Sequence, residues 1–316
     1  MKISVAVCTY NGEPYIREQL ESILAQSRSV DEIVVGDDGS SDKTIEIVTN
    51  VLQKSDVSYR ILQNKKLGVA QNFATTIQAC DGDIVFTSDQ DDVWMPNKVK
   101  RIEEQFCDPE VALVFTNALL VNHKLESLSR KLWEVYPFDQ AQVETSFLDI
   151  LLKYNVVTGA TMAFRREQFL QMLPIPSGCL HDEWIAIRSV QFGKAIALDE
   201  MLIQYRQHGG NVVGAKKESF FQKTEKYLNN FQKVTEIKKN KYEFYNNAWN
   251  ALKKNVSVEK REKLQRCVKY WRESLELQEK GLVSGTKWII SSLKCYQKYY
   301  TGIRGAFRDW VVLLKG

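Results

Sequence analysis

The first 116 residues alternate short apolar runs with amphipathic segments, and this alternation constrains the fold more than any other feature. The runs have strand length, and the segments between them repeat apolar residues at helical spacing. Strands are expected at residues 3–7, 32–35, 59–62, 84–87 and 112–115, and helices at 15–26, 42–52, 69–79 and from Pro96 onwards. This order predicts βαβ units, and hence a mainly parallel sheet with helices on both faces.

The rest of the chain divides into two parts of different character. After a mixed stretch at residues 123–142, the pattern predicts helices at 147–153 and around 184–187, and strands at 161–164, 195–198 and 202–205. Beyond residue 216 the chain is rich in Lys, Gln, Asn, Tyr and Leu, with no proline and no strand pattern, which predicts helices. We therefore expect an α/β catalytic domain over residues 1–214, with halves of about 1–116 and 117–214, and a helical region over 215–316.

Composition excludes several classes of protein. The net charge of +4 is too mild to indicate a nucleic-acid partner. None of the six cysteines forms a CxxC pair, which is typical of a reducing compartment. The sequence shows neither a secretory signal nor a run of roughly 18–20 apolar residues that could cross a bilayer. We expect the chain in the cytoplasm, where it can still contact a membrane surface.

Polar and acidic residues follow three of the expected strands. They are residues 9–12 (Thr-Tyr-Asn-Gly), 36–40 (Gly-Asp-Asp-Gly-Ser) and 88–92 (Ser-Asp-Gln-Asp-Asp). Ligands of open α/β sheets bind at the carboxyl ends of the strands, where these segments are expected to meet. Two acidic clusters at neighbouring strand ends repel each other unless a cation or hydrogen-bond donors neutralise them.

Asp89 and Asp91 flank a single residue directly after an apolar strand. Two carboxylates so spaced can hold a hard divalent cation, and such an ion can bridge the phosphates of a nucleoside diphosphate. Breaking a sugar–phosphate bond places negative charge on the departing diphosphate, and a cation lowers that barrier. A solvated acidic turn is the alternative, which the preceding strand disfavours.

The pair Asp37-Asp38 is the second acidic signal. A tight turn with Asp42 as the helix N-cap explains Asp42 well, but it needs no pair of adjacent acids. One of the two carboxylates could accept the imide N–H of uracil or thymine.

Taken in order, the sequences VAVCTYNG (residues 5–12), DDGS (37–40) and DQDDVW (89–94) resemble family 2 glycosyltransferases of the GT-A fold. The DQDDxW variant is similar to bacterial rhamnosyltransferase-like enzymes that build surface polysaccharides. The resemblance covers roughly residues 1–214. It implies a Rossmann-like catalytic domain, transfer of a sugar from dTDP-rhamnose or a UDP-sugar with inversion, and Mn or Mg as the cofactor.

The resemblance also implies roles for individual residues. The donor nucleotide is expected to contact Thr9, Tyr10, Glu13, Asp37, Asp38, Asn72 and Asp89, with Asp37 favoured over Asp38 for the pyrimidine. Asp91 is expected to be the main metal ligand, with Asp89 shared between the metal and the ribose.

The segment His181-Asp182-Glu183-Trp184 begins an expected helix. Helix capping explains its acids in ordinary terms. The resemblance implies that Asp182, rather than Glu183, is the general base that takes the proton of the acceptor hydroxyl. For in-line attack this base must lie across the site from the metal, which explains why a separate segment supplies it.

The stretch from Tyr205 to Asn211 is the fourth motif, and it also matches the rhamnosyltransferase-like pattern. Arg206 suits a loop that contacts a diphosphate. His208 is a candidate metal ligand or phosphate donor, with a structural histidine as the alternative. Residues 158–161 are expected on the acceptor side, although a simple turn explains them equally well.

Aromatic and basic residues alternate in the last part of the chain, from Trp288 to Lys315. This pattern suits the headgroup layer of an anionic membrane, where a lipid-linked oligosaccharide acceptor would be found. Packing on the catalytic domain or a homodimer contact is the alternative. Two other functions stay open, a phosphoacceptor signalling domain based on Asp37-Asp38 and an inactive carbohydrate-binding module. A nucleotide-dependent oxidoreductase is disfavoured, because no GxGxxG follows the first strand.

Overall fold

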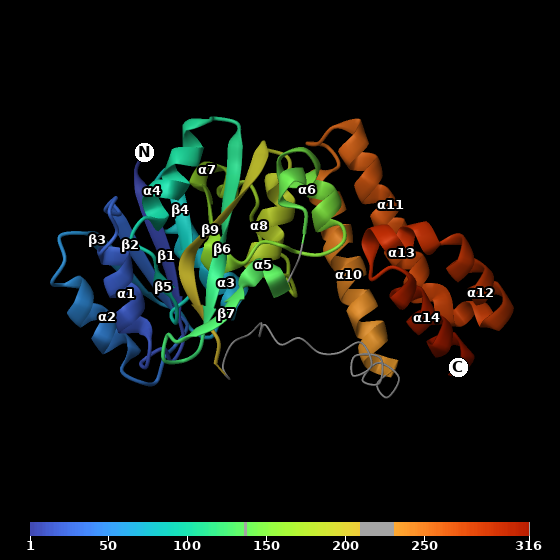
Figure 1. Cartoon of the computed structure of the whole chain (residues 1–316), viewed down its shortest axis with the longest axis horizontal. Helices are drawn as coiled ribbons and strands as arrows, with labels where there is room; N and C mark the ends of the chain where they lie inside the picture. Colours follow the sequence, from blue (N-terminus) through green and yellow to red (C-terminus); the bar gives the residue numbers. More distant parts are fainter. Residues whose placement is uncertain (136–137, 209–230, 316) are drawn as a thin grey trace. The chain divides into compact units, whose positions relative to one another are not determined.

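The structure is a computed structural model that describes residues 1–135, 138–208 and 231–315 (Figure 1). The chain forms two compact units. The first contains Met1–Phe147 and Val156–Ala215, and the second contains Leu148–Asn155 and Lys216–Gly316. The domain boundary expected at residue 214 lies outside the described residues. The assignment of Leu148–Asn155 to the second unit was not expected.

Nine strands of the described residues form one sheet in the first unit. They are β1 (Ile3–Thr9), β2 (Glu32–Asp37), β3 (Ser58–Gln63), β4 (Ile84–Ser88), β5 (Val93–Trp94), β6 (Val111–Val121), β7 (Ser127–Lys131), β8 (Met162–Arg165) and β9 (Lys194–Arg206). The order in the sheet is β3-β2-β1-β4-β8-β6-β9-β5, with β7 paired to β6. The helices are α1 (Ile16–Leu24), α2 (Thr44–Leu52), α3 (Val69–Gln78), α4 (Lys98–Glu103), α5 (Leu132–Val135), α7 (Arg166–Leu170) and α8 (His181–Ser189). Helix α6 (Val143–Leu151) contains a boundary between the two units.

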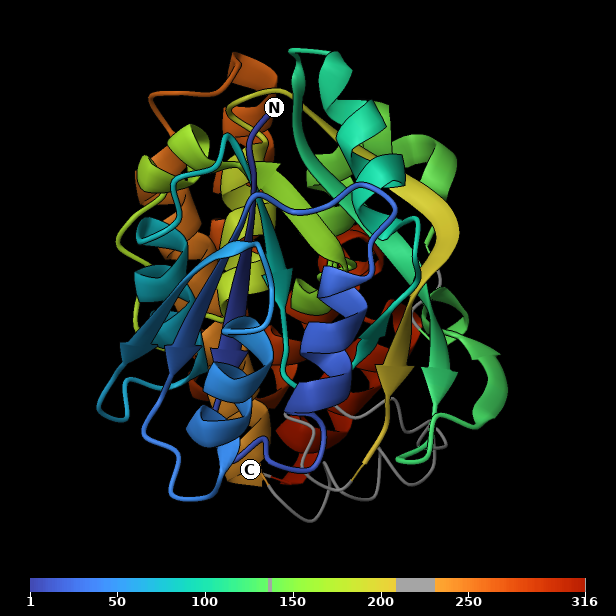
Figure 2. The ribbon, with the colours of Figure 1, turned by 90° about the vertical axis from the view of Figure 1, so that its left-hand side faces the viewer.

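The strands β1 to β4 form a parallel block, and the blue strands of Figure 2 show their common direction. All residues of β1, β2 and β4 are buried, as expected for strands covered on both faces. The register pairs Thr9 with Asp37 and Val7 with Ser88, so these strands end at one edge of the sheet. Strand β9 is parallel to β6 and ends at the same edge with Arg206. The expected fold class is confirmed.

Several details differ from the expectation, including β7 and α5 within the stretch expected to be mixed. Residues 195–198 and 202–205 belong to one long strand, β9, because its polar centre is held by side chains. Asn117 Nδ2 donates to Asp199 Oδ1 (2.7 Å), and Arg101 pairs with Glu200 (2.6 Å), where the register of β9 with β6 shifts. The two-residue strand β5 is too short to give a period. Helix α4 begins at Lys98, two residues after the proline expected to open it.

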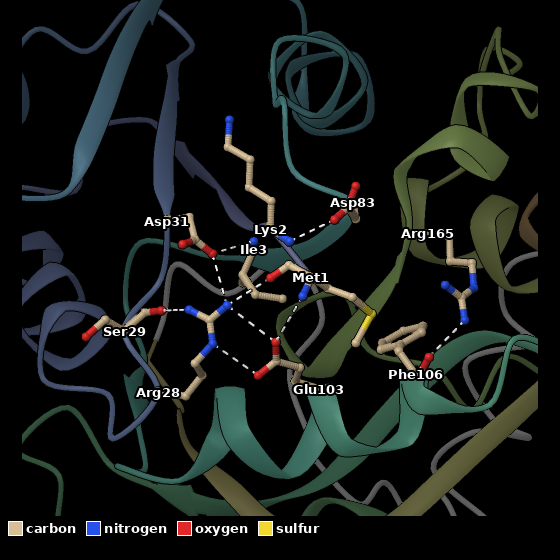
Figure 3. Close-up of polar contacts among 10 residues, drawn as sticks. All are labelled: Met1, Lys2, Ile3, Arg28, Ser29, Asp31, Asp83, Glu103, Phe106 and Arg165. Carbon is tan, nitrogen blue, oxygen red and sulfur yellow. Dashed lines mark hydrogen bonds and ion pairs between the residues drawn. The ribbon is translucent and has the colours of Figure 1, made fainter.

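A cluster of charged and backbone groups surrounds Arg28 at the opposite, amino edge of the sheet (Figure 3). The Arg28 guanidinium contacts Glu103 (3.1 Å), Asp31 (3.1 Å) and the carbonyl oxygen of Met1 (2.9 Å). The backbone N–H of Lys2 donates to Asp83 (2.8 Å). These contacts join the start of β1 to α4 and to the turn before β4, so the groups at this edge serve the packing of the sheet.

The second unit is helical over its described residues. It contains α10 (Phe231–Leu252), α11 (Val258–Leu275), α12 (Gly281–Ser291), α13 (Leu293–Tyr299) and α14 (Ile303–Lys315), with a 3-10 turn at Glu276–Lys280. Its core holds Asp309, which is 1% exposed and contacts Lys238 (2.9 Å) and the hydroxyl of Tyr296 (2.5 Å). The expected helical character is confirmed. None of the described helices combines the length and apolar character needed to cross a bilayer.

Candidate active site

The adjacent acids Asp37 and Asp38 accept hydrogen bonds that hold the loops around the ends of β1 and β2. Thr9 Oγ1 donates to Asp37 Oδ1 (2.8 Å), and the N–H groups of Gly39 and Ser40 donate to Asp37 Oδ2 (3.1 and 2.9 Å). Asp38 accepts the N–H groups of the two residues before α3, at positions 67 and 68 (2.6 and 2.8 Å). Each acid therefore organises a different loop, which explains why the turn contains two. Both side chains are buried, and their oxygens already accept from the chain's own donors.

The remaining residues expected at the nucleotide differ in exposure. Tyr10 is 51% exposed, and Glu13 is also exposed and accepts the N–H of Lys43 (3.1 Å). Asn72 is buried and donates to the carbonyl oxygen of Gly36 (2.8 Å). Of this group, Tyr10 and Glu13 are accessible to a ligand, whereas Asn72 supports the end of β2.

Gln90, the middle residue of the acidic turn, holds the backbone of Tyr10 from both sides. Its Oε1 accepts the Tyr10 N–H (2.8 Å), and its Nε2 donates to the Tyr10 carbonyl oxygen (3.1 Å). The turn after β4 is thereby joined to the turn after β1. The sequence does not predict this role, because an amide between two acids looks like an ordinary surface residue.

Asp89, Asp91 and Asp92 lie together at the end of β4. Burial raises the pKa of Asp89 to about 7, with the charge of Asp91 as the next cause and that of Asp182 after it. Asp92 is 1% exposed, and its Oδ1 accepts the N–H of Arg206 (2.8 Å) while Oδ2 has no hydrogen-bond partner. The negative charge of Asp182 acts on Asp89, which means that the acid expected as the base and the acidic turn share one region of the molecule.

His208 meets Asp91, as its proposed role at a metal would require. The distance from His208 Nε2 to Asp91 Oδ2 is 2.7 Å, and the imidazole stacks on Tyr15 with ring centroids 5.0 Å apart. Within the described residues, no three His, Cys, Asp or Glu side chains form a ready metal cage. A carboxylate and imidazole pair beside a second carboxylate fits an ion whose further ligands are diphosphate oxygens and water.

Arg206 was expected at the diphosphate, but its side chain faces the interior and is 2% exposed. Its guanidinium donates to the Asp91 carbonyl oxygen, the His123 carbonyl oxygen and Glu18 Oε2, each at 2.6 Å. It therefore braces the acidic turn against α1 and the turn after β6. The rest of this motif, from residue 209 to 211, lies outside the described residues.

Asp182 lies in the first turn of α8, and two backbone N–H groups hold it. Oδ1 accepts from Glu183 (2.7 Å) and Oδ2 from Gly159 (3.2 Å). Gly159 is the first residue of a 3-10 turn (Gly159–Thr161). The Gly159 carbonyl oxygen accepts a hydrogen bond from Thr87 Oγ1 in β4 (2.5 Å). Residues 158–161 thus connect Asp182 to the strand that ends in the acidic turn. Burial raises the pKa of Asp182 to about 7, and the charge of Glu183 adds to this shift.

His181, beside Asp182, packs as an apolar ring. It is 5% exposed, stacks on Phe73 with ring centroids 3.8 Å apart, and forms no hydrogen bond through either ring nitrogen. Burial lowers its pKa to about 3, so the ring is neutral near pH 7.

Lys98 is a buried lysine close to Asp89 and Asp92, and the sequence does not predict its burial. It is 0% exposed, its Nζ donates to the Ala160 carbonyl oxygen (2.7 Å), and it lies 3.9 Å from the centroid of the Trp94 ring. Burial lowers its pKa to about 7, against the opposing effect of Asp92 and Asp89. Trp94 lies in β5 and Lys98 begins α4, so no helical spacing in the sequence predicts this contact.

Tyr205 at the end of β9 responds to the same group of acids. Its pKa is raised by burial first and then by the charges of Asp92, Asp89, Asp91 and Asp182. The Tyr205 hydroxyl group therefore lies near both the turn at residues 89–92 and Asp182.

Comparison with known proteins identifies the family of the chain. The sequence model of Glycosyl transferase family 2 matches residues 4–170. An uncharacterized glycosyltransferase of Nostoc sp. is 28% identical over 258 residues, covering 73% of this chain and 76% of the relative. A dTDP-rhamnosyl transferase of Shigella flexneri is 30% identical over 234 residues, covering 66% of this chain and 74% of the relative.

Two solved structures share the fold. S. aureus TarS 1-349 in complex with UDP-GlcNAc superimposes with a TM-score of 0.60 at 18% identity, covering 95% of this chain and 82% of that chain. The mannosyltransferase PcManGT from Pyrobaculum calidifontis, in complex with GDP-Man and Mn²⁺, gives 0.57 at 16% identity, covering 99% and 86%. The chain described here belongs to glycosyltransferase family 2 and has the GT-A fold.

Proposed function

We propose that this glycosyltransferase is metal-dependent and inverting, with Asp182 as the general base. The observation that carries the proposal is the position of Asp182. Its Oδ2 accepts the N–H of Gly159 (3.2 Å), and the Gly159 carbonyl oxygen accepts from Thr87 Oγ1 (2.5 Å) in β4, the strand that ends in the turn at residues 89–92. Two groups of acids from segments far apart in the sequence thus act on one region, the carboxyl edge of the sheet. Family 2 membership supports the reaction class.

Asp182 is suited to accept a proton from an acceptor hydroxyl. Its two backbone hydrogen bonds fix the carboxylate in place, and a raised pKa makes it a better proton acceptor near neutral pH than an exposed aspartate. As the proton leaves, the hydroxyl oxygen attacks the anomeric carbon from the side opposite the diphosphate. The C–O bond to the diphosphate breaks, and the anomeric configuration inverts.

Asp91, His208 and Asp89 are the residues that would hold Mn or Mg. Such an ion, when bound, supplies positive charge against the diphosphate leaving group. Arg206 donates to the Asp91 carbonyl oxygen and so fixes the backbone of Asp91. Gln90 joins the same turn to Tyr10 by a hydrogen bond. Tyr10 and Glu13 are exposed beside this turn and can contact the nucleotide, whereas Asp37, Asp38 and Asn72 shape the loops around it.

The donor is dTDP-rhamnose or a UDP-sugar, and the acceptor is a hydroxyl of a growing, lipid-linked polysaccharide. The relative named as a dTDP-rhamnosyl transferase supports the first choice of donor. This acceptor would place the enzyme at the inner face of the plasma membrane, with peripheral contact through the C-terminal helices. A phosphoacceptor role is disfavoured, because both carboxylates of Asp37-Asp38 are buried and hydrogen-bonded.

Calorimetric titration with dTDP and UDP, with and without Mn²⁺, tests the metal site. We expect Mn²⁺ to strengthen binding to the wild-type protein, and Asp91→Ala to reduce this gain by at least about tenfold. Asp56→Ala, which removes an exposed acid on another loop, is the matched control and should behave as wild type. Equal nucleotide affinity with and without the metal in the wild-type protein would refute metal dependence. A panel of nucleotide sugars assayed for turnover would then identify the donor.

A further inference from the structure

Helix α14 presents an unpartnered apolar stripe. Ile303, Phe307, Trp310 and Leu314 are 69%, 50%, 38% and 50% exposed, and the spacing of four, three and four residues puts them on one side of the helix. The rings of Phe307 and Trp310 contact each other, with centroids 6.5 Å apart. We call these four residues the α14 stripe.

The other side of α14 is the side that packs. Ala306, Asp309 and Leu313 are 4%, 1% and 7% exposed. The core of the second unit is therefore satisfied without the α14 stripe, and large apolar side chains exposed together indicate an interaction surface.

Helix α12 packs against α14 and adds to the exposed apolar area. A Cβ atom at Gly285 of α12 would lie 2.5 Å from the side chain of Leu313, so the two helices approach closely. On α12, Val283 and Ile290 are 70% and 63% exposed and lie seven residues apart, which places them near one line along that helix.

The charges in this segment have one sign. Residues 281–315 contain six basic side chains, namely Lys287, Lys294, Lys298, Arg304, Arg308 and Lys315, and one acidic side chain, Asp309. Asp309 is 1% exposed and paired with Lys238, and Arg308 is 8% exposed. Lys287, Lys294 and Arg304 are exposed. The segment contributes +5 to a chain of net charge +4, which leaves −1 for all other residues. The helices that carry the α14 stripe and its neighbours α12 and α13 therefore also carry exposed basic side chains and no exposed acid among the described residues of 281–315.

We propose that the α14 stripe and the exposed basic residues Lys287, Lys294 and Arg304 dock on an anionic lipid surface. Aromatic and aliphatic side chains enter the headgroup layer, and Lys and Arg attract anionic headgroups. A second copy of the chain fits less well, because a two-fold contact would bring two basic surfaces together. This inference deepens the proposed function, on which it rests for the lipid-linked acceptor.

Co-sedimentation of the full-length protein with vesicles tests the surface. Vesicles of phosphatidylcholine alone are compared with vesicles that also contain phosphatidylglycerol. We expect wild-type protein to bind the anionic vesicles and to release as salt is raised. The double variant Phe307→Ser/Trp310→Ser should bind at least about tenfold more weakly, since it loses two aromatic anchors. Arg304→Glu/Lys294→Glu should reduce binding to the anionic vesicles alone.

The matched control is Leu128→Ser/Val258→Ser, which removes two exposed apolar side chains outside α12 and α14. It should bind as wild type, and circular dichroism checks that all variants are folded. Equal binding to both kinds of vesicle, no binding by wild type, or a wild-type dimer that Phe307→Ser/Trp310→Ser dissociates would overturn the proposal. Donor hydrolysis in the absence of vesicles is measured in parallel. If the wild-type protein does not hydrolyse any donor, the proposed function is contradicted. Vesicle binding would still test whether the α14 stripe docks on lipid.

Discussion

The pKa of Asp182 is raised by some of its surroundings and lowered by others. Burial and the charge of Glu183 raise its pKa to about 7, while the N–H groups of Glu183 and Gly159 act in the other direction. The base of the proposed reaction would therefore change its protonation state close to neutral pH.

We expect kcat to fall as the pH drops below about 7, because protonated Asp182 cannot accept the hydroxyl proton. Asp182→Asn should lower kcat by about 10²- to 10⁴-fold and leave donor binding near normal. Glu183→Gln should move the acidic limb of the pH profile to lower pH, because it removes a charge that raises the pKa of Asp182. A profile of kcat against pH for the three proteins checks this. An acidic limb of unchanged midpoint in Asp182→Asn would assign it to another group.

Some residues near the acidic turn could be anticipated and others could not. Asp89 and Asp91 follow a buried strand with a spacing that suggests chemistry, and local sequence was enough to find them. Lys98 looks like any lysine at the start of an amphipathic helix. Its role depends on Ala160, 62 residues away, and on burial that only the packed structure reveals. Arg206 has the residue type expected for a phosphate contact, but its acceptors come from three separate segments.

Helix α3 packs closely on β2 beside the site. A Cβ atom at Gly36 would lie 1.9 Å from Thr76 Oγ1 and 2.8 Å from Asn72 Oδ1. Gly36 precedes Asp37, so the close packing of α3 on β2 also holds the Asp37-Asp38 turn at the end of β2.

Gly36→Ala should therefore destabilise the protein by about 1–3 kcal/mol, because the helix must shift to admit the methyl group. The double variant Gly36→Ala/Thr76→Ala removes the nearest obstructing atom and should recover part of this loss relative to Thr76→Ala alone. Urea unfolding of the four proteins measures the coupling. Additive effects would show that the two positions do not compete for the same space.

At this scale, periodicity was informative where elements are regular and longer than a few residues. The β1–β4 block and its helices follow the expected order because each strand is continuously apolar and each helix repeats its apolar residues. The sequence pattern predicts two strands where the structure has the single strand β9. The polar residues Asp199 and Glu200 interrupt the pattern, and their partners are remote in sequence. Strands β5 and β7 are short or exposed, and neither gives a clear apolar pattern.

Considered as a whole molecule, the chain makes its second unit from two separate stretches. Residues 148–155 belong with the C-terminal helices. Tyr245 of α10 is 1% exposed and donates to the Leu151 carbonyl oxygen (2.8 Å), and Lys263 of α11 pairs with Asp149 (2.6 Å). A boundary drawn from composition alone could not have included this segment.

Tyr245→Phe should lower the stability of the second unit by about 1–3 kcal/mol, because the buried carbonyl oxygen of Leu151 loses a donor. Tyr242→Phe, at a half-exposed position on the same helix, is the control and should change stability by less than about 0.5 kcal/mol. Thermal and urea unfolding of the two variants provide the comparison. Equal effects would mean that the Tyr245 hydroxyl is not a special contact.

The interleaved segment also has a consequence for synthesis on the ribosome. Leu151 leaves the ribosome 94 residues ahead of Tyr245, its partner. N-terminal parts generally fold first during translation, so the sheet can assemble while residues 148–155 still await the helices that cover them. Until those helices emerge, this stretch lacks the partners that cover it in the folded protein, and a chain terminated early would keep it uncovered.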